Sequence, residues 1–268
     1  MAEGGAAFVG SIPTTYERLL VPLIFAEPAR HLAATVLATH PRDILETCAG
    51  TGVLTRQLVA EGDAYITATD LSAPMLRTAL SLCGSDRVTW QVADAMDLPF
   101  GPGSFDVVAC QFGAMFFPDK PRGYAEALRV LRPGGSLVFS VWDRIEESPS
   151  WQIVDAAINA VAGDVPVRFL RRAPYSYFDR DLIRRHLEIA GFGDVAIENL
   201  TGTSRSTPEE TAEAICQGTP LRMALATHPT LSVQQATQHA TRALRDAYGV
   251  GPFEAPIGWL QISAGSAS

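Results

Sequence analysis

Three acidic side chains close or follow β-rich runs in the first half of the chain. Glu46 follows DIL, Asp70 closes AYITATD and Asp94 closes VTWQVAD. In an open α/β sheet, ligands bind beyond the carboxyl ends of the strands. A carboxylate there can accept hydrogen bonds from both hydroxyls of a ribose or from the amino group of adenine. A carboxylate also repels a pyrophosphate and favours an ammonium or sulfonium group.

The loop ETCAGTG (46–52) joins the first of these runs to a helical pattern. Gly50 and Gly52 let a ligand approach the backbone because neither has a Cβ, and the N-terminus of the following helix attracts an anion. The dinucleotide-binding pattern G-x-G-x-x-G requires a small residue three positions after Gly52, where this chain has Thr55. The lysine of a phosphate-binding P-loop is absent as well. Asp70 alone would suit NAD equally well. The acids and the loop together predict a site for ribose, adenine and a cationic amino-acid tail, which describes S-adenosylmethionine.

The elements that position these residues alternate between strand and helix. Ser72 is the predicted cap of a helix that carries Met75, Leu76, Ala79 and Leu80, and Asp119 caps a later one. The alternation is typical of a doubly wound, Rossmann-like α/β fold with a mostly parallel sheet, for which seven strands and helical cap elements are expected. The predicted strands are DILETC (43–48), AYITATD (64–70), VTWQVAD (88–94), FDVVACQF (105–112), SLVFSVW (136–142), DVAIENL (194–200) and EAPIGWLQIS (254–263).

Four regions are predicted along the chain. Residues 1–40 form N-terminal helices that cover the active site, with a break near Pro22 and with Pro28 in the first turn of a second helix. Residues 41–143 form a cofactor-binding Rossmann-like core, and residues 144–180 form a cap insertion. Residues 181–268 form the end of the sheet and include inserted helices at 201–252. In the helix at 232–248, Val233, Ala236, Ala240, Leu244 and Ala247 share one face. The N-terminal helices, 144–178 and 201–252 are expected to form the acceptor cavity.

Composition limits the classes of partner. The chain has 268 residues, of which 47% are hydrophobic, and a formal net charge of −8, so nucleic acid and anionic membranes are not expected as partners. Four cysteines without a CxxC pair indicate a reduced, intracellular chain. The first residues lack the pattern of a signal peptide and LLVPLIFA (19–26) is too short to span a bilayer, so a cytoplasmic location is predicted. The histidines lack metal-ligand spacing, and no metal is expected. A homodimer is left open.

Five blocks in order carry a family resemblance: ETCAGTG, ATDLSAPML, VADAMDLPF, FDVVACQFGAMFFPD and LRVLRPGGSLVFSVW. From about Asp43 to Trp142 the chain resembles the class I S-adenosylmethionine-dependent methyltransferases, in the small-molecule branch of the ubiquinone/menaquinone-biosynthesis type. The later EIAGFGDVAIENL is similar to the sixth-strand region of that family. Cys48 is one departure, because it stands at the first glycine position of the loop, and its small side chain is interpreted as a packing residue.

The resemblance implies a role for each matching position. Asp70 would hold the ribose, and Tyr16 resembles an aromatic that closes over the cofactor. Gln111 and Phe112 would lie under the sulfonium, next to the methyl group. The remaining cofactor-binding positions are Glu46, Thr47, Cys48, Ala49, Gly50 and Gly52 around the methionine part, Leu71 and Met75 beside the adenine, and Asp94, Ala95 and Met96 at the adenine edge. The resemblance does not identify a catalytic base.

The implied activity is methyl transfer by in-line displacement to a small-molecule acceptor. A protein or RNA methyltransferase, and a non-catalytic S-adenosylmethionine-binding protein of the same fold, remain as alternatives. Gln111 at the end of the fourth strand is not an acid, which disfavours a metal-dependent catechol-type enzyme. An NPPY-like tetrapeptide is absent, which disfavours an enzyme that methylates the amino groups of nucleic-acid bases. Met115, Phe116 and Phe117 fit either the lining of an apolar acceptor pocket or the core.

Overall fold

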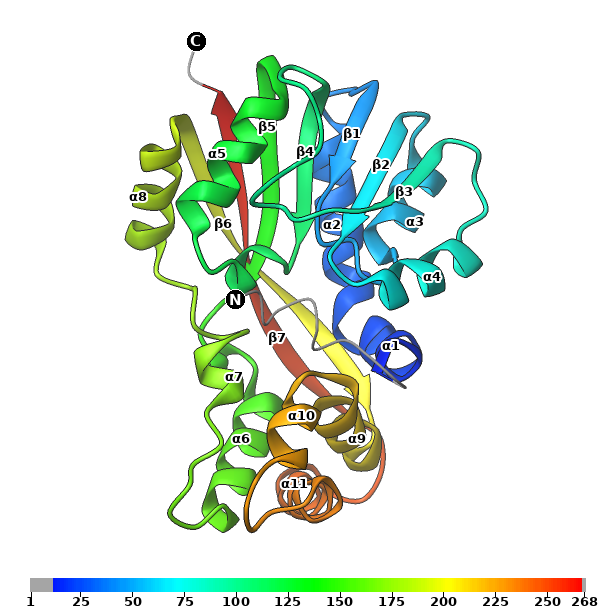
Figure 1. Cartoon of the computed structure of the whole chain (residues 1–268). Coiled ribbons are helices and arrows are strands. Elements are labelled where there is room, and N and C mark those ends of the chain that lie inside the picture. The colour runs from blue at the N-terminus through cyan, green and yellow to red at the C-terminus, as the bar shows by residue number, and fades with distance from the viewer. Residues whose placement is uncertain (1–11, 267–268) are drawn as a thin grey trace.

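The computed structural model describes residues 12–266, and a seven-stranded sheet runs through its centre (Figure 1). The strand order is β3-β2-β1-β4-β5-β7-β6. Parallel pairs join β1 to β2 and β4, β2 to β3, and β4 to β5, whereas β7 runs antiparallel to both β5 and β6. The strands are β1 (Asp43–Glu46), β2 (Tyr65–Asp70), β3 (Val88–Val92), β4 (Phe105–Gln111), β5 (Leu131–Trp142), β6 (Phe192–Ser206) and β7 (Phe253–Ser266). The predicted doubly wound, mostly parallel fold is confirmed.

Two hydrophobic clusters cover the two faces of the sheet. Successive residues of a strand alternate between them: Ile44 packs in one cluster and Leu45 in the other, and Val107 and Val108 divide in the same way. This alternation follows from the pleat, because neighbouring side chains of a strand point to opposite faces. The parallel strands are therefore buried on both faces, which explains why their sequences are nearly continuous apolar runs.

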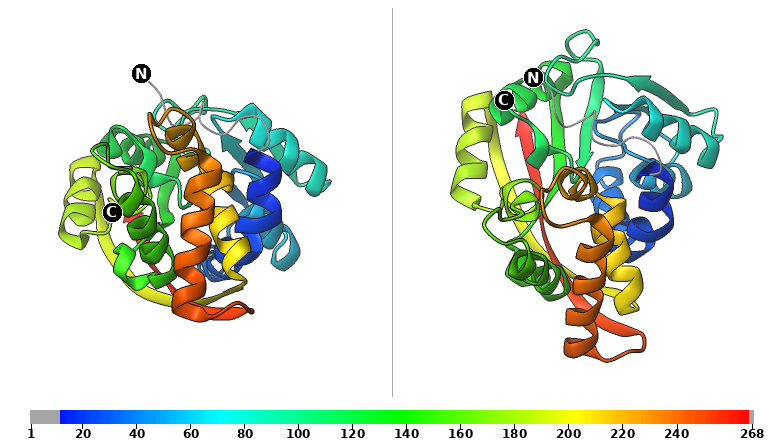
Figure 2. Two further views of the ribbon diagram at one scale, coloured as in Figure 1. Left: turned by 90° about the horizontal axis from the view of Figure 1, so that it is seen from below. Right: turned by 60° about the horizontal axis from the view of Figure 1, so that its bottom comes forward.

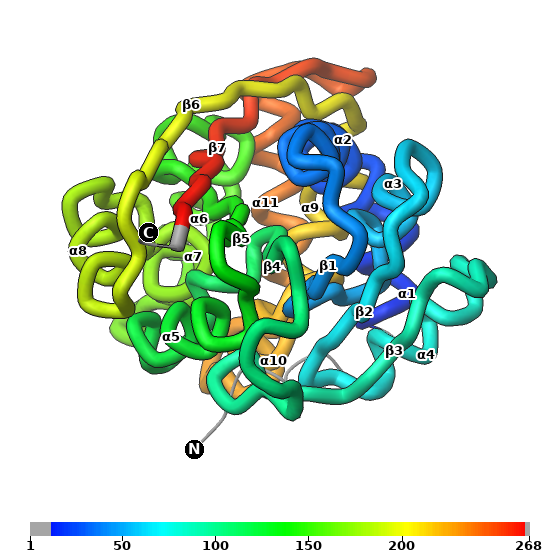
Figure 3. The backbone as a smooth tube through the Cα atoms, turned by 90° about the horizontal axis from the view of Figure 1, so that it is seen from above, coloured from blue at the N-terminus to red at the C-terminus, as the bar shows by residue number. Residues whose placement is uncertain are grey.

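Helices flank the sheet and extend beyond the carboxyl ends of its parallel strands. The α-helices are α1 (Ile12–Thr15), α2 (Ala26–Leu37), α3 (Val53–Glu61), α4 (Ala73–Leu82), α5 (Lys120–Val130), α6 (Pro149–Val161), α7 (Phe169–Arg172), α8 (Arg180–Ala190), α9 (Pro208–Gly218), α10 (Leu221–Ala226) and α11 (Val233–Tyr248). Short 3-10 turns lie at η3 (Ala114–Phe116) and η4 (Ile145–Glu147). Figures 1 and 2 show α6, α9, α10 and α11 gathered below the strand ends, and Figure 3 shows the twist of the sheet from above.

The predicted break near Pro22 is wrong. Between α1 and α2 the chain forms a π-helix, η2 (Tyr16–Phe25), and Pro22 lies inside it. The wider hydrogen bonding is seen at Ala26, whose N–H donates to the carbonyl of Val21. Proline lacks an N–H and its ring crowds the carbonyl four residues earlier. The wider π turn therefore lets the helical path continue where an α-helix would kink.

Three further differences concern the ends of helices. Leu80 is 58% exposed and lies on α4, which packs near β3, the edge strand of the sheet. Ala247 is exposed as well. Tyr248 continues the inward stripe of α11 instead, and its ring stacks on Phe253. The inserted helices begin after β6, which runs to Ser206.

The helical stretch Ile12–Leu37 is long and apolar enough to cross a membrane by length and composition, and 56% of its most apolar window is buried inside the fold. Within the segment, Leu20, Leu32 and Val36 are completely buried. The predicted N-terminal region, residues 1–40, is described from Ile12 onward, and its first part lies outside the described residues.

Candidate active site

A cavity of about 1220 Å³, its open mouth included, lies at the carboxyl ends of the parallel strands. Core strands and loops line one side of it, and the π-helix, α6, α7 and the α9–α10 turn line the other. The cavity is therefore bounded by the sheet and its loops on one side and by the covering helices on the other.

Asp70 and Asp94 are the two charged side chains among the described residues that line this cavity. Asp70 accepts hydrogen bonds from the backbone N–H of Gly50 at 2.9 Å and from that of Ser72 at 2.7 Å. Burial raises the pKa of the Asp70 carboxyl, and these two N–H groups oppose the rise. Asp94 accepts one hydrogen bond from the N–H of Met96 at 2.9 Å. Both carboxylates retain acceptor capacity toward the cavity.

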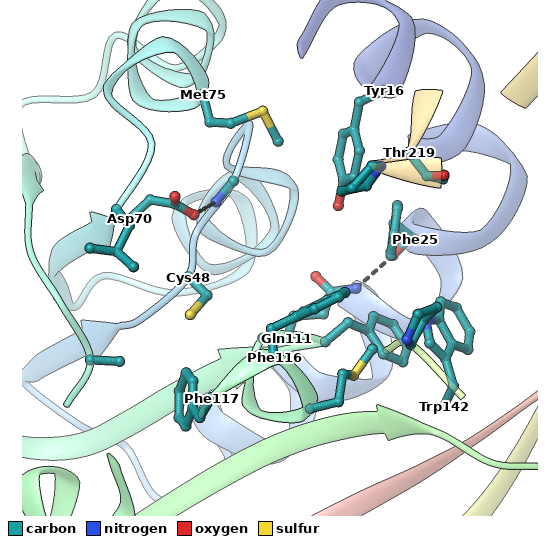
Figure 4. Close-up of a pocket in the computed structure, with 18 of the residues that line it drawn as sticks. Tyr16, Phe25, Cys48, Asp70, Met75, Gln111, Phe116, Phe117, Trp142 and Thr219 are labelled. Atoms are coloured by element: carbon teal, nitrogen blue, oxygen red, sulfur yellow. Dashed lines mark hydrogen bonds between the residues drawn. The ribbon is translucent and has the colours of Figure 1, made fainter. Parts of the chain in front are cut away.

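The loop after β1 turns sharply beside Asp70 (Figure 4). Cys48, Gly50 and Gly52 all have positive φ angles, of 55°, 58° and 79°. A Cβ on Gly50 would make only an ordinary contact at 3.6 Å, so its surface is open toward the cavity. A Cβ on Gly52 would lie 2.7 Å from the Trp90 ring, so this glycine makes room for packing and does not line the cavity.

Glu46 lies beneath the loop rather than at the cavity. Its side chain is 1% exposed and accepts a 2.6 Å hydrogen bond from the hydroxyl of Thr55 on α3. Burial raises the pKa of Glu46 to about 8, against the opposing effect of the Thr55 hydrogen bond. Thr55, the residue that breaks the dinucleotide fingerprint, is thus the partner of the first of the three acids.

Aromatic rings form the wall opposite the acids. Phe112, with a positive φ of 51°, stacks on Trp142 with centroids 3.8 Å apart and an interplanar angle of 10°. Phe25 of the π-helix packs on both rings and stacks on Tyr16 at 4.9 Å. Offset or stacked aromatic pairs contribute about 0.5–1.5 kcal/mol beyond burial. The wall is therefore rigid and apolar.

Tyr16 brings the N-terminal helix over the cavity (Figure 4). Burial raises the pKa of its phenol, with a further rise from the charge of Asp70, so the hydroxyl stays neutral. The neighbouring Glu17 pairs with Arg56 of α3 at 2.7 Å, and Arg56 also donates to the carbonyl of Thr51 at 2.7 Å. This half-buried ion pair ties the covering helix to α3 and to the loop after β1.

The structure brings together most of the residues singled out in the sequence. Tyr16, Cys48, Gly50, Asp70, Leu71, Met75, Asp94, Ala95, Met96, Gln111 and Phe112 line the cavity. Glu46, Thr47, Ala49 and Gly52 belong to the same loop but do not reach its surface. Met115, Phe116 and Phe117, which fitted either pocket or core, also line it.

Several lining residues were not identified from the sequence. They are Leu20, Ile24, Phe25, Ala93, Gly113, Pro118, Trp142, Trp151, Phe169, Leu170, Pro174, Thr219 and Pro220. Most come from the stretches expected to form the acceptor cavity, but their individual positions depend on how distant helices pack. Within residues 12–266, no group of three or more His, Cys, Asp or Glu side chains could hold a metal ion.

Comparison with known proteins agrees with this geometry. A family model described as a methyltransferase domain matches residues 45–139. A demethylmenaquinone methyltransferase of Clavibacter sepedonicus is 31% identical over 209 residues, covering 73% of this chain and 85% of that protein. The chain belongs to the class I S-adenosylmethionine-dependent methyltransferases of the ubiquinone/menaquinone-biosynthesis type. This methyltransferase therefore uses S-adenosylmethionine as its cofactor.

Solved structures share the fold of the methyltransferase at low sequence identity. A structure from Bacillus halodurans, described as a candidate methyltransferase, has a TM-score of 0.60 at 18% identity and covers 90% of this chain and 100% of that one. The phosphoethanolamine N-methyltransferase 2 of Haemonchus contortus in complex with S-adenosyl-L-methionine has a TM-score of 0.55 at 18% identity and covers 97% of this chain and 61% of that one.

The cavity of the methyltransferase fits this cofactor. Two carboxylates at its polar end suit hydroxyl and amino donors, and their negative charge suits a cationic sulfonium but not a pyrophosphate. The open surface of Gly50 gives a ligand access to the backbone.

Cys48 and Gly113 pack against each other, and this contact predicts that a methyl group added at Gly113 destabilises the protein. A Cβ on Gly113 would lie 2.4 Å from the Cys48 Cβ and 2.8 Å from the Cys110 Sγ. We expect Gly113→Ala to lower the free energy of unfolding by about 1–3 kcal/mol and to weaken S-adenosylhomocysteine binding. Adding Cys48→Gly should recover part of both losses, because it removes the clashing atoms at a position with positive φ.

Urea unfolding and calorimetry measure the two effects. Gly84→Ala is the matched control, because a Cβ there meets no atom within 4 Å. Equal unfolding free energies for Gly113→Ala and the wild-type protein would contradict the close contact.

The raised pKa of Glu46 predicts a pH dependence of stability. The folded protein keeps a proton that the unfolded chain releases between about pH 4.5 and 8, so stability falls as pH rises through this window. The slope contributed by one proton is at most about 1.4 kcal/mol per pH unit. Glu46→Gln should remove this slope, whereas the exposed Glu61→Gln should keep it. Urea unfolding at several pH values checks the result, and an unchanged slope in Glu46→Gln would show that the carboxyl is ionised in the fold.

Proposed function

We propose that the enzyme transfers the methyl group of S-adenosylmethionine to an apolar, ring-containing small molecule that occupies the same cavity. The observation that carries this proposal is the polarity of the cavity. Its acidic end is formed by Asp70 and Asp94, and its other end by the stacked rings of Phe112 and Trp142. Both ends belong to one continuous space, as in-line displacement requires.

Cofactor binding is assigned to the residues at the acidic end. Asp70 accepts hydrogen bonds from the ribose hydroxyls, and Asp94 with Ala95 and Met96 recognises the adenine edge. Leu71 and Met75 pack beside the adenine, while Cys48, Gly50 and the buried loop residues beneath them shape the methionine site. Tyr16 closes over the bound cofactor from the π-helix. The support is the lining of the cavity and the open surface of Gly50.

The bound cofactor supplies a carbon already activated by positive sulfur, so the protein contributes alignment and exclusion of water. The helix that carries Tyr16 and Phe25 is held down by the Glu17–Arg56 ion pair at 2.7 Å and covers the reacting centre. The rings of Phe112 and Trp142 give the acceptor a flat, rigid surface. Alignment of this kind can lower a barrier by roughly 7–11 kcal/mol.

The relatives favour a quinone-like acceptor. The similar protein of Clavibacter sepedonicus is a demethylmenaquinone methyltransferase, and one of Stutzerimonas stutzeri is a ubiquinone/menaquinone biosynthesis C-methyltransferase. A wall of aromatic rings suits the stacking of such an acceptor. An acceptor that is part of a protein or RNA would have to enter between α7, the α9–α10 turn and the π-helix, whose residues line the cavity.

We also propose a cytoplasmic site of action. All four cysteines, Cys48, Cys83, Cys110 and Cys216, are free, and three of them are buried. Free thiols persist in reducing compartments, whereas oxidising ones favour disulfides.

The role of Asp70 is tested with a pair of ligands that differ in the ribose hydroxyls. Asp70→Ala should weaken S-adenosylhomocysteine binding by roughly 10- to 100-fold, the range for hydrogen bonds to a charged group. The same variant should lose most of the preference for S-adenosylhomocysteine over its 2′,3′-dideoxy analogue. Calorimetry with both ligands on both proteins separates direct recognition from disorder of the Gly50 loop, which would weaken both ligands equally. Equal weakening, or tight binding of NAD by the wild-type protein, would contradict the assignment.

Methyl transfer itself is tested with S-adenosylmethionine labelled in its methyl group. A 2-prenyl-1,4-naphthohydroquinone kept reduced is the acceptor probe, and label in the organic extract is the readout. We expect label in the ring compound and loss of most of it in Trp142→Ala. Transfer to RNA or to protein in a mixed substrate assay, with none to the probe, would reject a small-molecule acceptor.

A further inference from the structure

Gln111 ends β4 at the junction between the acidic and the aromatic parts of the cavity (Figure 4). Its side-chain Nε2 donates a 2.9 Å hydrogen bond to the backbone carbonyl of Phe25 on the π-helix. Its Oε1 is buried and finds no hydrogen-bond partner among the residues that the structure describes. In Figure 4 this oxygen points away from Trp142, toward the side of the cavity that carries Cys48.

The direction of this amide follows from its partner. A carbonyl oxygen can only accept a hydrogen bond, so the nitrogen of Gln111 must face Phe25 and the oxygen must face the cavity. The backbone holds the side chain from the other direction. Phe112 has a positive φ of 51°, and its N–H donates to the carbonyl of Ser140 at 3.0 Å. Residues held in sparsely populated backbone regions cluster at active sites.

A buried acceptor without a donor is costly. Leaving such an atom unsatisfied in an apolar site typically changes an equilibrium by about 5- to 150-fold. Thr219, another polar side chain that lines the cavity, does not supply a donor. Thr219 uses its hydroxyl within the protein, donating to the carbonyl of Ile215 at 2.7 Å and accepting from the N–H of Leu221 at 3.2 Å. Phenylalanine rings carry no N–H or O–H, and the indole N–H of Trp142 makes no hydrogen bond to Gln111 Oε1 within the described residues.

We propose that Gln111 is the specificity-determining residue for the acceptor: its Oε1 accepts a hydrogen bond from an acceptor hydroxyl and so positions the ring beside the transferable methyl group. The proposal rests on the small-molecule function proposed above. The resemblance to methyltransferases placed Gln111 under the sulfonium, whereas the geometry assigns its oxygen to the second ligand. The site then selects a ring that carries a hydroxyl group. It rejects the matching ether or carbonyl compound, because the oxygen of either one cannot donate a hydrogen bond to Gln111 Oε1.

This assignment explains two features together. The Phe112–Trp142 stack supplies a flat apolar surface, and Gln111 supplies one directional contact at its edge. Pockets that read a hydroxyl with a buried polar group discriminate strongly against the analogue that lacks it, because the protein atom is then left unpaired. The Phe25 contact also couples the hydroxyl site to the helix that covers the cavity.

The experiment uses three probes that share one ring system and differ in donors: 1,4-naphthohydroquinone, 4-methoxy-1-naphthol and 1,4-dimethoxynaphthalene. Their affinities are measured on the full-length protein saturated with S-adenosylhomocysteine, by quenching of tryptophan fluorescence. The wild-type protein should bind the two hydroxyl-bearing probes roughly 10- to 100-fold more tightly than the dimethyl ether. Gln111→Met, of similar size but without a polar atom, should bind all three with similar affinity.

Two further variants separate hydrogen bonding from a structural role. Gln111→Glu keeps an acceptor oxygen but loses the Nε2 donor to the Phe25 carbonyl, so it should keep the preference for hydroxyl-bearing probes only at low pH, where the protonated carboxyl group donates to that carbonyl. Thr219→Val removes a polar group of the same wall whose hydroxyl is engaged within the protein, and it should leave the ratio between probes unchanged. With the labelled cofactor, Gln111→Met should raise the KM for 4-methoxy-1-naphthol far more than it raises the KM for S-adenosylmethionine.

Several outcomes would overturn the proposal. One is equal binding of the three probes by the wild-type protein, and another is an unchanged ratio in Gln111→Met. A loss of S-adenosylmethionine affinity in Gln111→Met, without a loss of S-adenosylhomocysteine affinity, would assign the oxygen to the sulfonium instead. If none of the probes binds while S-adenosylmethionine does, the inference fails and the methyltransferase function stands. If S-adenosylmethionine itself does not bind, the proposed function fails.

Discussion

The Asp70 carboxylate is the interaction on which the cofactor end of the structure depends. One of its oxygens accepts the N–H of Gly50 and the other that of Ser72, so a single side chain joins the loop after β1 to the start of α4. Parallel neighbouring strands place these segments at one edge of the sheet. The carboxylate therefore fixes the loop that we propose shapes the methionine site, and it presents its remaining acceptor positions to the cavity. The position of Asp70 follows from the end of β2 in the sheet, and the raised pKa of its carboxyl group follows from burial.

The acceptor end is organised by a different principle, since it is built from rings rather than charges. Phe112 and Trp142 stack at the ends of adjacent strands, and Phe25 joins them from the π-helix. Gln111 is the polar contact where the two ends meet, and its bond to Phe25 makes the covering helix part of the same wall. With the role proposed for Gln111, substrate orientation and closure of the site share one hydrogen bond.

Much of this arrangement could be predicted from sequence because it is local. The strand runs, the caps at Ser72 and Asp119, and the acids at the end of β2 and after β3 follow from short patterns, and all of them are present. Glu46 could not be placed in this way. Glu46 is the last residue of β1, but Thr55 of α3 holds its carboxyl group beneath the loop, away from the cavity. Gly52, taken for a ligand contact, is required by Trp90, a residue of a different strand.

The acceptor wall was the least predictable part. Trp142, Trp151 and Thr219 come from three separate regions and meet only when the cap helices pack on the strand ends. The π-helix was also missed, because a proline normally signals a break and the wider turn depends on tertiary packing.

A crystal structure of the protein with S-adenosylhomocysteine and 4-methoxy-1-naphthol tests the central claim most directly. The account predicts that the ribose hydroxyls donate to Asp70 and that the naphthol hydroxyl donates to Gln111 Oε1, with the ring against Phe112 and Trp142. A nucleoside bound away from Asp70, or a naphthol that turns its ether oxygen toward Gln111, would contradict it.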